Sequence, residues 1–525
     1  MRRAAAVAVV VAALAAPAAA HGAVTWGPAQ TVPNATGQDN ATLEQDGLAV
    51  FADGGAFALG FASDNNGGGQ NLASTERAPG GPFSPITNFT SPAGQTESGQ
   101  TAADARGDIA VVYLRQTTST SPAISDVIAQ IRPAGQTRFG PPEIVDETTN
   151  PPLTPPSWDA AMGSDGTLYV IVSRGVTLPN PGQDQSGPTV VYTCPVGGTF
   201  DGGITLAEAS TYPTAPRIAA GQNGRAVAAW AWSDIVPPPE TLPPNWVQAS
   251  VRSPAGGWTE AENVSDPNAD QNTFAVEGAV AGGGRAVVAF TRALRQPVEQ
   301  DILSAAARPP RGQFATPEDI SSAGFDVSPD FDLAVATDGR GILVWGQQQS
   351  GGGFTPAQVT GADYDAHRGF GPPVLLSDPT ANSSEPLAVV GNGGRAVVGF
   401  DAQINPFSNP VSFAQARDRA PGQDFGPIVD LFGGPGLNSG ELTGLGMDAA
   451  GNPVAVGSAQ HGNTITNFAV SGTRAPKPPP PTPQGPAGPQ GPAGAEGPAG
   501  PQGSPGSGAV GPRAPSAGAT AHRST

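Results

Sequence analysis

Four charged residues recur at one position of a repeated pattern in this 525-residue chain. Each stands seven residues before a glycine that is expected to turn the chain; they are Asp159, Arg217, Glu277 and Asp332. Carboxylates gathered around an arginine can bind a sugar or a cation, and paired carboxylates can carry acid–base catalysis. We therefore take these four residues as a candidate ligand-binding group. The alternative is that the solvated ends of strands carry charges without any ligand.

The same position in the other copies of the pattern is uncharged, so a site built from these residues would be one-sided. Those residues are Leu48, Gln100, Leu387 and Gly444. The chain has no G-x-S-x-G, H-E-x-x-H, P-loop or C-x-x-C motif, and each of those motifs would place a nucleophile, a metal or a phosphate. We accordingly assign no catalytic residue, no metal ligand and no cofactor.

Two landmarks define the repeat that must position these residues. A turn glycine recurs at intervals of 52 to 60 residues, and an aromatic residue that opens a fourth strand recurs at intervals of 55 to 61. The glycines are Gly55, Gly107, Gly166, Gly224, Gly284, Gly339, Gly394 and Gly451, and the aromatics are Trp26, Phe83, Phe139, Phe200, Trp258, Phe314, Phe370 and Phe425. Both counts give eight copies.

Each copy reads as four short strands. Residues 276–321 contain four apolar runs separated by turns that carry Gly or Pro, which is typical of an antiparallel meander. Pairs such as Asp165-Gly166 and Asn223-Gly224 favour two-residue hairpins, in which Gly accepts positive φ. The aromatic residues are expected to pack between neighbouring sheets.

The ends of the repeat region predict how the molecule closes. The strand that contains Trp26 precedes the first turn glycine, whereas the last copy runs into Pro-rich sequence without a fourth strand. The N-terminal strand would therefore complete the last sheet. This arrangement predicts an all-β, eight-bladed β-propeller over residues 21–475, with seven blades as the alternative. A solenoid would also repeat regularly, but it does not explain the displaced strand.

Composition limits the function classes. Gly at 72 and Pro at 58 suit many short strands and turns. A formal net charge of −19 disfavours nucleic acid as a partner, because phosphates require a cationic surface. A single cysteine, Cys194, excludes an intramolecular disulfide.

The N-terminus predicts export. Residues 1–20 combine Arg2 and Arg3 with an Ala/Val-rich run and end in three alanines, as a secretory signal cleaved near Ala20 does. No later stretch approaches the length of a transmembrane span. We expect a secreted or cell-wall-associated protein.

The C-terminus changes composition abruptly. Residues 476–484 form a Pro-rich linker, and residues 485–508 carry Gly at every third position. A collagen triple helix requires that spacing, because only Gly fits at its axis. The eight triplets leave open either weak trimerisation or a flexible stalk, and residues 509–525 are expected to be disordered.

The repeats resemble the sialidase-like, BNR-type propellers of secreted bacterial proteins. The likeness covers residues 21–475 and lies in the recurring GGRAVVxF and RxPxGxF elements. Residues 164–169 are a degenerate form of that family's Asp box, and Pro216-Arg217-Ile218 is a faint match to its arginine motif. The family's full catalytic set is not recognisable, so no catalytic role is transferred. The tail resembles the collagen-like stalks of bacterial surface proteins.

The sequence thus favours an exported binding or adhesion module, displayed on a Pro-rich, collagen-like tail, whose partner is a glycan or a surface protein. It leaves enzymatic activity open. A divergent sialidase-like glycoside hydrolase or lyase is the first alternative, and a structural protein of the cell wall or matrix is the second.

Overall fold

The structure is a computed structural model of the chain. It describes residues 24–34, 41–63, 70–90, 95–117, 124–148, 156–177, 184–208, 216–233, 245–267, 271–294, 300–351, 355–404, 411–434, 439–461, 464–474, 491 and 493–503. The predicted signal, the Pro-rich linker and the C-terminal residues 509–525 lie outside this set. The chain divides into two compact units, Met1–Lys477 and Pro478–Thr525.

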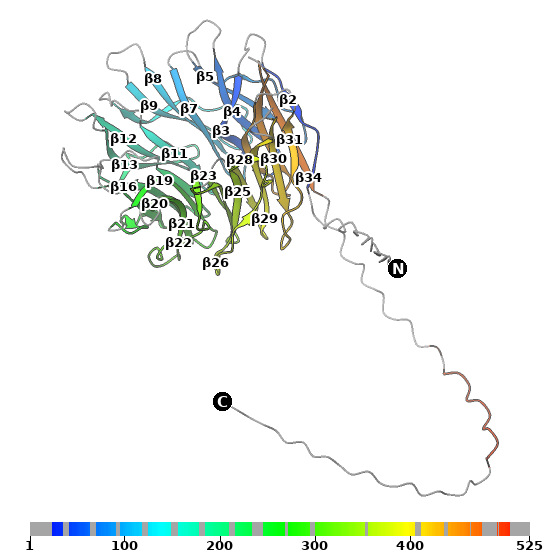
Figure 1. Ribbon diagram of the computed structural model, residues 1–525. Helices are drawn as coiled ribbons and strands as arrows, with labels where there is room; N and C mark the ends of the chain where they lie inside the picture. The colour runs from blue at the N-terminus through cyan, green and yellow to red at the C-terminus, as the bar shows by residue number, and fades with distance from the viewer. Residues whose placement is uncertain are drawn as a thin grey trace, which may run out of the picture. The chain divides into compact units, whose positions relative to one another are not determined.

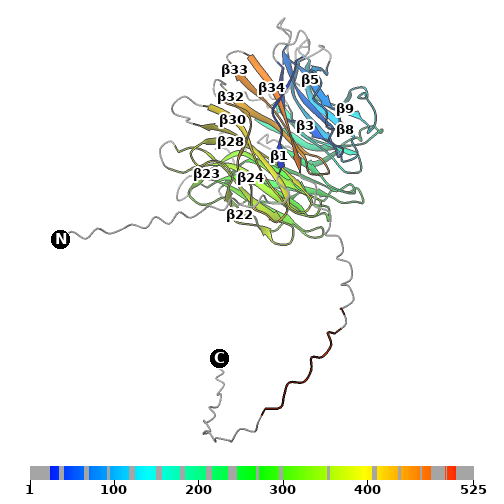
Figure 2. The same ribbon diagram turned by 90° about the vertical axis from the view of Figure 1, so that its right-hand side faces the viewer.

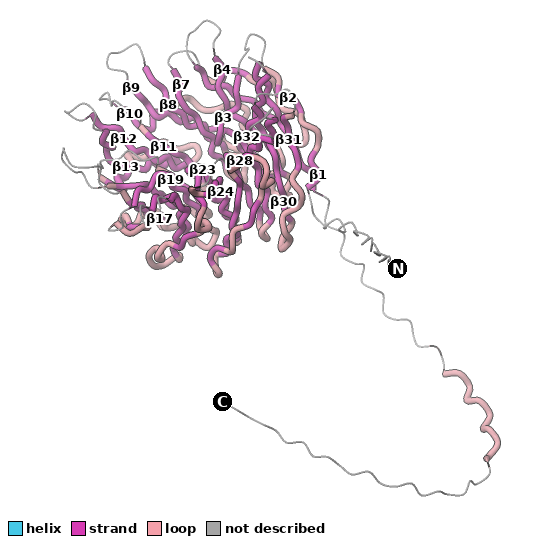
Figure 3. Tube along the Cα trace, in the orientation of Figure 1, coloured by secondary structure: helices cyan, strands magenta, loops and turns pink. Residues whose placement is uncertain are grey.

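Every regular element in the described residues is a β-strand (Figure 3). These residues contain no helix that is long and apolar enough to cross a membrane. The strands form eight antiparallel sheets, which we call blades 1 to 8. Blades 1 and 2 contain β3 (Ala41–Val50), β4 (Ala56–Ser63), β5 (Gln70–Arg77), β6 (Thr87–Asn88), β7 (Gln95–Ala103), β8 (Ile109–Thr117), β9 (Ile124–Arg132) and β10 (Glu143–Thr148). Blades 3 and 4 contain β11 (Ser157–Met162), β12 (Thr167–Thr177), β13 (Asp184–Pro195), β14 (Ile204–Ala207), β15 (Arg217–Ala220), β16 (Ala226–Trp232), β17 (Trp246–Arg252) and β18 (Glu262–Asn263).

The second half of the ring continues the pattern. Blades 5 and 6 contain β19 (Gln271–Val280), β20 (Ala286–Leu294), β21 (Gln300–Arg308), β22 (Glu318–Asp319), β23 (Phe325–Val335), β24 (Arg340–Gln349), β25 (Gln358–Asp365), β26 (Gly369–Phe370) and β27 (Val374–Leu375). Blades 7 and 8 contain β28 (Asn382–Gly391), β29 (Arg395–Ile404), β30 (Val411–Arg419), β31 (Val429–Gly433), β32 (Ser439–Met447), β33 (Pro453–His461), β34 (Thr464–Arg474), β1 (Val24–Trp26) and β2 (Gln30–Val32).

The blades are arranged in a ring around one central axis (Figures 1 and 2), and we call the region along this axis the central channel. The first strand of each blade contacts the first strand of the next, and β32 of blade 8 contacts β3 of blade 1. The molecule is therefore a closed eight-bladed β-propeller, as the two landmarks predicted, and the seven-blade alternative is wrong.

Closure depends on the displaced N-terminal strand. Both β1 and β2 pair with β34, in a register that sets Val24 opposite Arg474 and Thr31 opposite Phe468. Figure 1 shows the blue β2 beside the orange β34. The last blade obtains its outer strand from the start of the chain, so the ring has no open edge at that point.

The landmark aromatics hold the blades together. Each of the eight lies in, or packs against, a different one of eight hydrophobic clusters. The fourth strands are shorter than the sequence suggested: in blade 5, β22 has only two residues, and Phe314 precedes it. Packing of the aromatic ring, more than strand pairing, therefore fixes the outer part of the blade.

The first hairpin of most blades differs from the predicted two-residue form. Gly163 N donates to Thr167 O and Gly166 N donates to Gly163 O, so the loop has three residues and ends in Gly166, at φ of 78°. Blades 2, 5, 6 and 8 repeat this arrangement. In blade 4 the turn bond instead runs from Arg225 N to Gln222 O, across Asn223 and Gly224, which both have positive φ as a type I′ turn requires. In blade 1 the left-handed residue is Gly54 rather than Gly55. Such loops also need Gly at positive φ, which is why the landmark was still correct.

The Gly-Arg pairs at these hairpins join neighbouring blades. The Nη1 of Arg340 donates to Gly393 O at 2.7 Å, and the Nη1 of Arg395 donates to Ala450 O at 2.8 Å. Arg225 makes the same kind of bond to Gly282 O, at 3.3 Å. The motif is a structural link at the end of the channel that carries the hairpins.

A chain that starts at residue 35, and so lacks β1 and β2, should melt at a clearly lower temperature and aggregate, because it leaves β34 as an unpaired edge. A chain that ends at Lys477 is the control and should melt as the full chain does. Differential scanning calorimetry of both makes the comparison; equal melting temperatures would show that the N-terminal strand does not close the ring.

Candidate functional site

The four predicted residues occupy one level of the central channel. Each lies on the inner strand of its blade and pairs with the residue five positions after its turn glycine; the pairs are Asp159 with Ile171, Arg217 with Ala229, Glu277 with Ala289, and Asp332 with Val344. Because successive side chains of a strand alternate between its faces, equal register gives all four the same orientation. Counting back from the turn glycine had therefore aligned the blades correctly.

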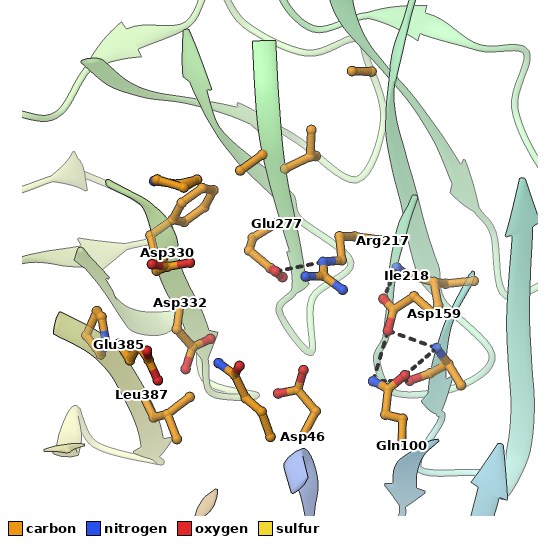
Figure 4. Close-up of a pocket in the computed structure, with 18 residues that line it drawn as sticks. Asp46, Gln100, Asp159, Arg217, Ile218, Glu277, Asp330, Asp332, Glu385 and Leu387 are labelled. Carbon is orange, nitrogen blue, oxygen red and sulfur yellow. Dashed lines mark hydrogen bonds and ion pairs between the residues drawn. The ribbon is translucent and has the colours of Figure 1, made fainter. Parts of the chain in front are cut away.

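The four side chains line one cavity of about 340 Å³ at the mouth of the channel (Figure 4). Gln100 and Leu387, which hold the same position in blades 2 and 7, also line it. A second cavity of about 200 Å³ shares Asp46, Gln100, Asp332 and Leu387 with the first, and Leu48 and Gly444 line it as well. Each of the eight equivalent positions thus lines at least one of these two adjoining cavities, although only four of them are charged.

The carboxylate of Asp159 connects three blades through hydrogen bonds. Its Oδ2 accepts from Ile218 N of blade 4 at 2.7 Å, and its Oδ1 accepts from Gln100 Nε2 of blade 2 at 2.9 Å. The Oδ1 also accepts from the N–H of Ala160, at 2.9 Å. Only 5% of the residue is exposed. Both oxygens are used, so Asp159 is a structural link that borders the cavity.

Asp332 makes the equivalent link between blades 6 and 7. Its Oδ2 accepts from Ala388 N at 2.7 Å, the same inter-blade bond that Asp159 makes to Ile218. Burial raises the pKa of Asp332 to about 6, although the hydrogen bond from Ala388 opposes that change. Asp332 therefore combines a structural bond with a carboxylate that gains a proton near neutral pH.

Arg217 and Glu277 form an ion pair across blades 4 and 5. The Nε of Arg217 lies 2.9 Å from Oε1 of Glu277, and their side chains are 35% and 26% exposed. Burial is the main cause that raises the pKa of Glu277 to about 8; Arg217 opposes this change, and Asp159, Asp332 and Asp46 contribute to it. The neighbouring Glu277 carboxylate is the main cause of a raised pKa for the Arg217 guanidinium.

Three further acidic residues, which the sequence analysis did not single out, also line the cavity: Asp46, Asp330 and Glu385. They come from blades 1, 6 and 7, two positions before the shared level. At each of them the inner strand leaves its ladder: the register shifts between Leu43 and Leu48, between Val327 and Phe331, and between Ser384 and Leu387. Bulges of this kind redirect side chains, and they are common beside functional sites.

Two of these residues have unusual backbones. Asp46 has φ of 60° and Glu385 has φ of 50°, a left-handed conformation that is costly for residues other than Gly. Within the described part of the chain, neither carboxylate has a hydrogen-bond or ion-pair partner. Burial raises the pKa of Asp46 and of Glu385, and Asp330 and Glu441 add to the effect on Glu385. A recurrent acid two positions before the shared level was the signal that could have identified them.

The charge of the cavity lining is strongly one-sided. Six carboxyl groups line it against one guanidinium, that of Arg217, among the described residues. Gln45, Gln100 and the carboxylates supply many hydrogen-bond acceptors, whereas Phe331, Ile218 and Val276 supply apolar wall. No group of three or more His, Cys, Asp or Glu side chains in the described ranges is placed to hold a metal ion. This lining suits a ligand rich in hydrogen-bond donors and repels an anion.

The solved structures that this chain resembles share little of its sequence. No family model matches the sequence, and neither does any curated protein. A solved structure of a protein of unknown function from Dyadobacter fermentans is 13% identical, with a TM-score of 0.39 over 85% of this chain and 99% of that one. A PL25 ulvan lyase is 10% identical, with a TM-score of 0.41 over 76% and 96%. The β-propeller domain of the trilobed protease from Pyrococcus furiosus is 11% identical, with a TM-score of 0.39 over 72% and 94%.

The raised pKa values make the stability of the propeller depend on pH. A carboxyl whose folded pKa lies above its unfolded pKa stabilises the fold fully below the unfolded value, and that contribution is lost as pH rises through the folded value. For Glu277 this window runs from 4.5 to about 8. The melting temperature should therefore fall between pH 5 and pH 8, and Glu277→Gln should reduce that fall. Asp424→Asn, which alters an exposed carboxyl, is the control. Identical slopes for Glu277→Gln and wild type would contradict the burial of this group.

Proposed function

We propose that this chain is an exported, non-catalytic binding module whose channel mouth recognises a carbohydrate through the hydroxyl groups of the sugar. The observation that carries the proposal is the cavity of about 340 Å³, lined by acceptors from six of the eight blades. Its volume lies in the range of small-molecule sites, which are about 300–1,000 Å³. Sugar hydroxyls would donate to the carboxylates, and a ring face could rest on Phe331. The sequence pattern of residues 1–20 supports export.

The lining also indicates which carbohydrates would be rejected. A sialic acid or a uronic acid needs cations around its carboxylate, and the family resemblance implies an arginine triad for that purpose. The one arginine that lines the described cavity is already paired with Glu277 at 2.9 Å. A second anion placed there would face six carboxyl groups. We therefore propose uncharged or cationic sugars as ligands.

One observation favours a second candidate function, that of a glycoside hydrolase. Such enzymes pair a protonated carboxylic acid with an ionised carboxylate. The pKa of Glu277 is about 8 and that of Asp332 is about 6. Two carboxyl groups of one cavity therefore differ in pKa, as the acid and the base of such an enzyme do. Glu277 would protonate the leaving oxygen, and an ionised neighbour would act on the anomeric carbon or on water. This candidate requires turnover, whereas the binding module does not.

Isothermal titration calorimetry with neutral oligosaccharides tests the binding proposal, together with matched sialylated ones. Neutral sugars should bind and sialylated sugars should not. Asp46→Asn should weaken binding about tenfold, because it removes a charge-assisted acceptor that has no structural partner in the described residues. Failure of every oligosaccharide to bind would refute the proposal. Hydrolysis of chromogenic neutral glycosides that Glu277→Gln abolishes would instead establish the enzyme.

We also propose that the Gly-x-y segment joins three copies of the chain. The described residues of the segment, 491 and 493–503, form neither helix nor strand. A Cβ atom built on Gly491, Gly494, Gly497, Gly500 or Gly503 meets no other atom within 4 Å, and none of these glycines has a positive φ. A single chain therefore gives no steric or conformational reason for the strict spacing, but the axis of a triple helix does.

Light scattering of the full chain in the cold should give three times the mass of one chain, and a chain that ends at Lys477 should be a monomer. Gly497→Ala should lower the temperature at which the trimer dissociates, because a methyl group does not fit at the axis. A monomeric full chain under the same conditions would contradict trimerisation, and it would leave the carbohydrate proposal unaffected.

A further inference from the structure

The cavity has two unlike sides (Figure 4). On one side Arg217 lies beside Glu277, and Asp159 is bonded to Gln100 and Ile218, so the charges there are largely satisfied within the protein. The opposite side we call the acidic wall. It consists of Asp46, Asp330, Asp332 and Glu385.

No cation of the protein pairs with the acidic wall within the described residues. Asp330 accepts a hydrogen bond from Ser328 Oγ at 3.0 Å, and Asp332 accepts one from Ala388 N at 2.7 Å. Both of these donors are neutral. Four carboxyl groups therefore border one space, and the guanidinium that lines it in the described residues, that of Arg217, opposes the charge of Asp46 and Asp332 only from a distance because it is paired with Glu277. Buried or confined charges are costly unless they are paired, so the wall is complete only with a positive partner.

Asp46 shows most clearly that this partner comes from outside the protein. Asp46 is exposed, and its side chain lies among the labelled residues that line the cavity (Figure 4). Its backbone is held in a left-handed conformation, and its carboxylate has no partner in the described ranges. Asp46 lines both the cavity of about 340 Å³ and the adjoining one of about 200 Å³. An unpaired acid is thus presented to a space that is large enough for a sugar ring.

We infer that the acidic wall is a subsite for a protonated amine, and that the ligand is an unacetylated hexosamine oligosaccharide. This inference rests on the proposed carbohydrate function and narrows its ligand class. An ammonium group has three donors and a positive charge, so it can bond to more than one carboxylate of the wall at once. An acetylated amine has one amide donor and no charge. The acetyl group therefore removes both features that the wall recognises.

The acidic wall also distinguishes this ligand from a neutral sugar of the same size. Hydroxyl groups can donate to carboxylates, but they leave the negative charge of the wall uncompensated. Charge-assisted hydrogen bonds are roughly twice as strong as neutral ones. Affinity for the amine should consequently fall with ionic strength, whereas affinity for a neutral sugar should change little.

Calorimetric titration of the full chain with three matched oligomers tests the inference: glucosamine, N-acetylglucosamine and glucose oligomers of equal length. The glucosamine oligomer should bind at least about tenfold more tightly than the other two, and 0.5 M salt should largely remove the difference. Glu385→Gln and Asp330→Asn should each reduce binding of the glucosamine oligomer selectively. Neither change removes an inter-blade hydrogen bond, so both variants should fold.

Asp424→Asn is the matched control, since it removes an exposed carboxyl that does not line the cavity. It should bind like the wild type, and it accounts for any general attraction to a chain of net charge −19. Equal affinity for all three oligomers would overturn the inference and leave the carbohydrate proposal standing. Binding that Glu385→Gln and Asp330→Asn do not alter would place the amine elsewhere and also overturn it. Failure of every oligomer to bind would refute both.

Discussion

Every blade of this propeller can bury its two faces only against its neighbours, so the whole structure depends on contact between adjacent inner strands. The hydrophobic clusters combine residues from successive blades, and they supply most of the stabilising burial. Polar bonds then fix the spacing: Asp159 accepts from Ile218 N, and Asp332 accepts from Ala388 N, each reaching one blade onward. At the other end of the channel, Arg340 and Arg395 make comparable links. The ring is thus held at both ends of its inner strands.

The same crowding gives the channel mouth its chemistry. Side chains that would be fully solvated on an open sheet converge here from several blades, and the confined space raises the pKa values of Glu277 and Asp332. Asp332 shows that a structural and a functional role are compatible in one side chain, because one of its oxygens bonds to Ala388 while the residue lines the cavity. Asp159 differs from Asp332, because both of its carboxylate oxygens already accept hydrogen bonds from neighbouring blades. The four charged residues of the shared level are therefore not equivalent in what they can offer a ligand.

Sequence reasoning reached the fold because its evidence was periodic. The turn glycine must accept positive φ, and the aromatic must fill the gap between blades, so both recur whatever else changes. The position of Glu277 on the ladder followed from the same count. Asp46, Asp330 and Glu385 each stand nine residues before their turn glycine, but they were missed because the sequence does not show that the inner strand leaves its ladder at these positions and turns the side chains to the cavity. The partners of Asp159 were also beyond the sequence, because a backbone N–H carries no residue-type signal.

The pairing of β1 with β34 has a consequence for the order in which the molecule can form. Thr25 and Thr473, which are bonded to each other in the finished ring, stand 448 residues apart in the chain. Synthesis runs from the N-terminus, so the first strand to emerge is joined to one of the last. Seven blades can assemble early from local hairpins, but the final one must wait for the far end of the propeller and pay a large loop-closure entropy. A chain that ends before β34 therefore cannot complete the ring, because β1 and β2 then have no strand to pair with.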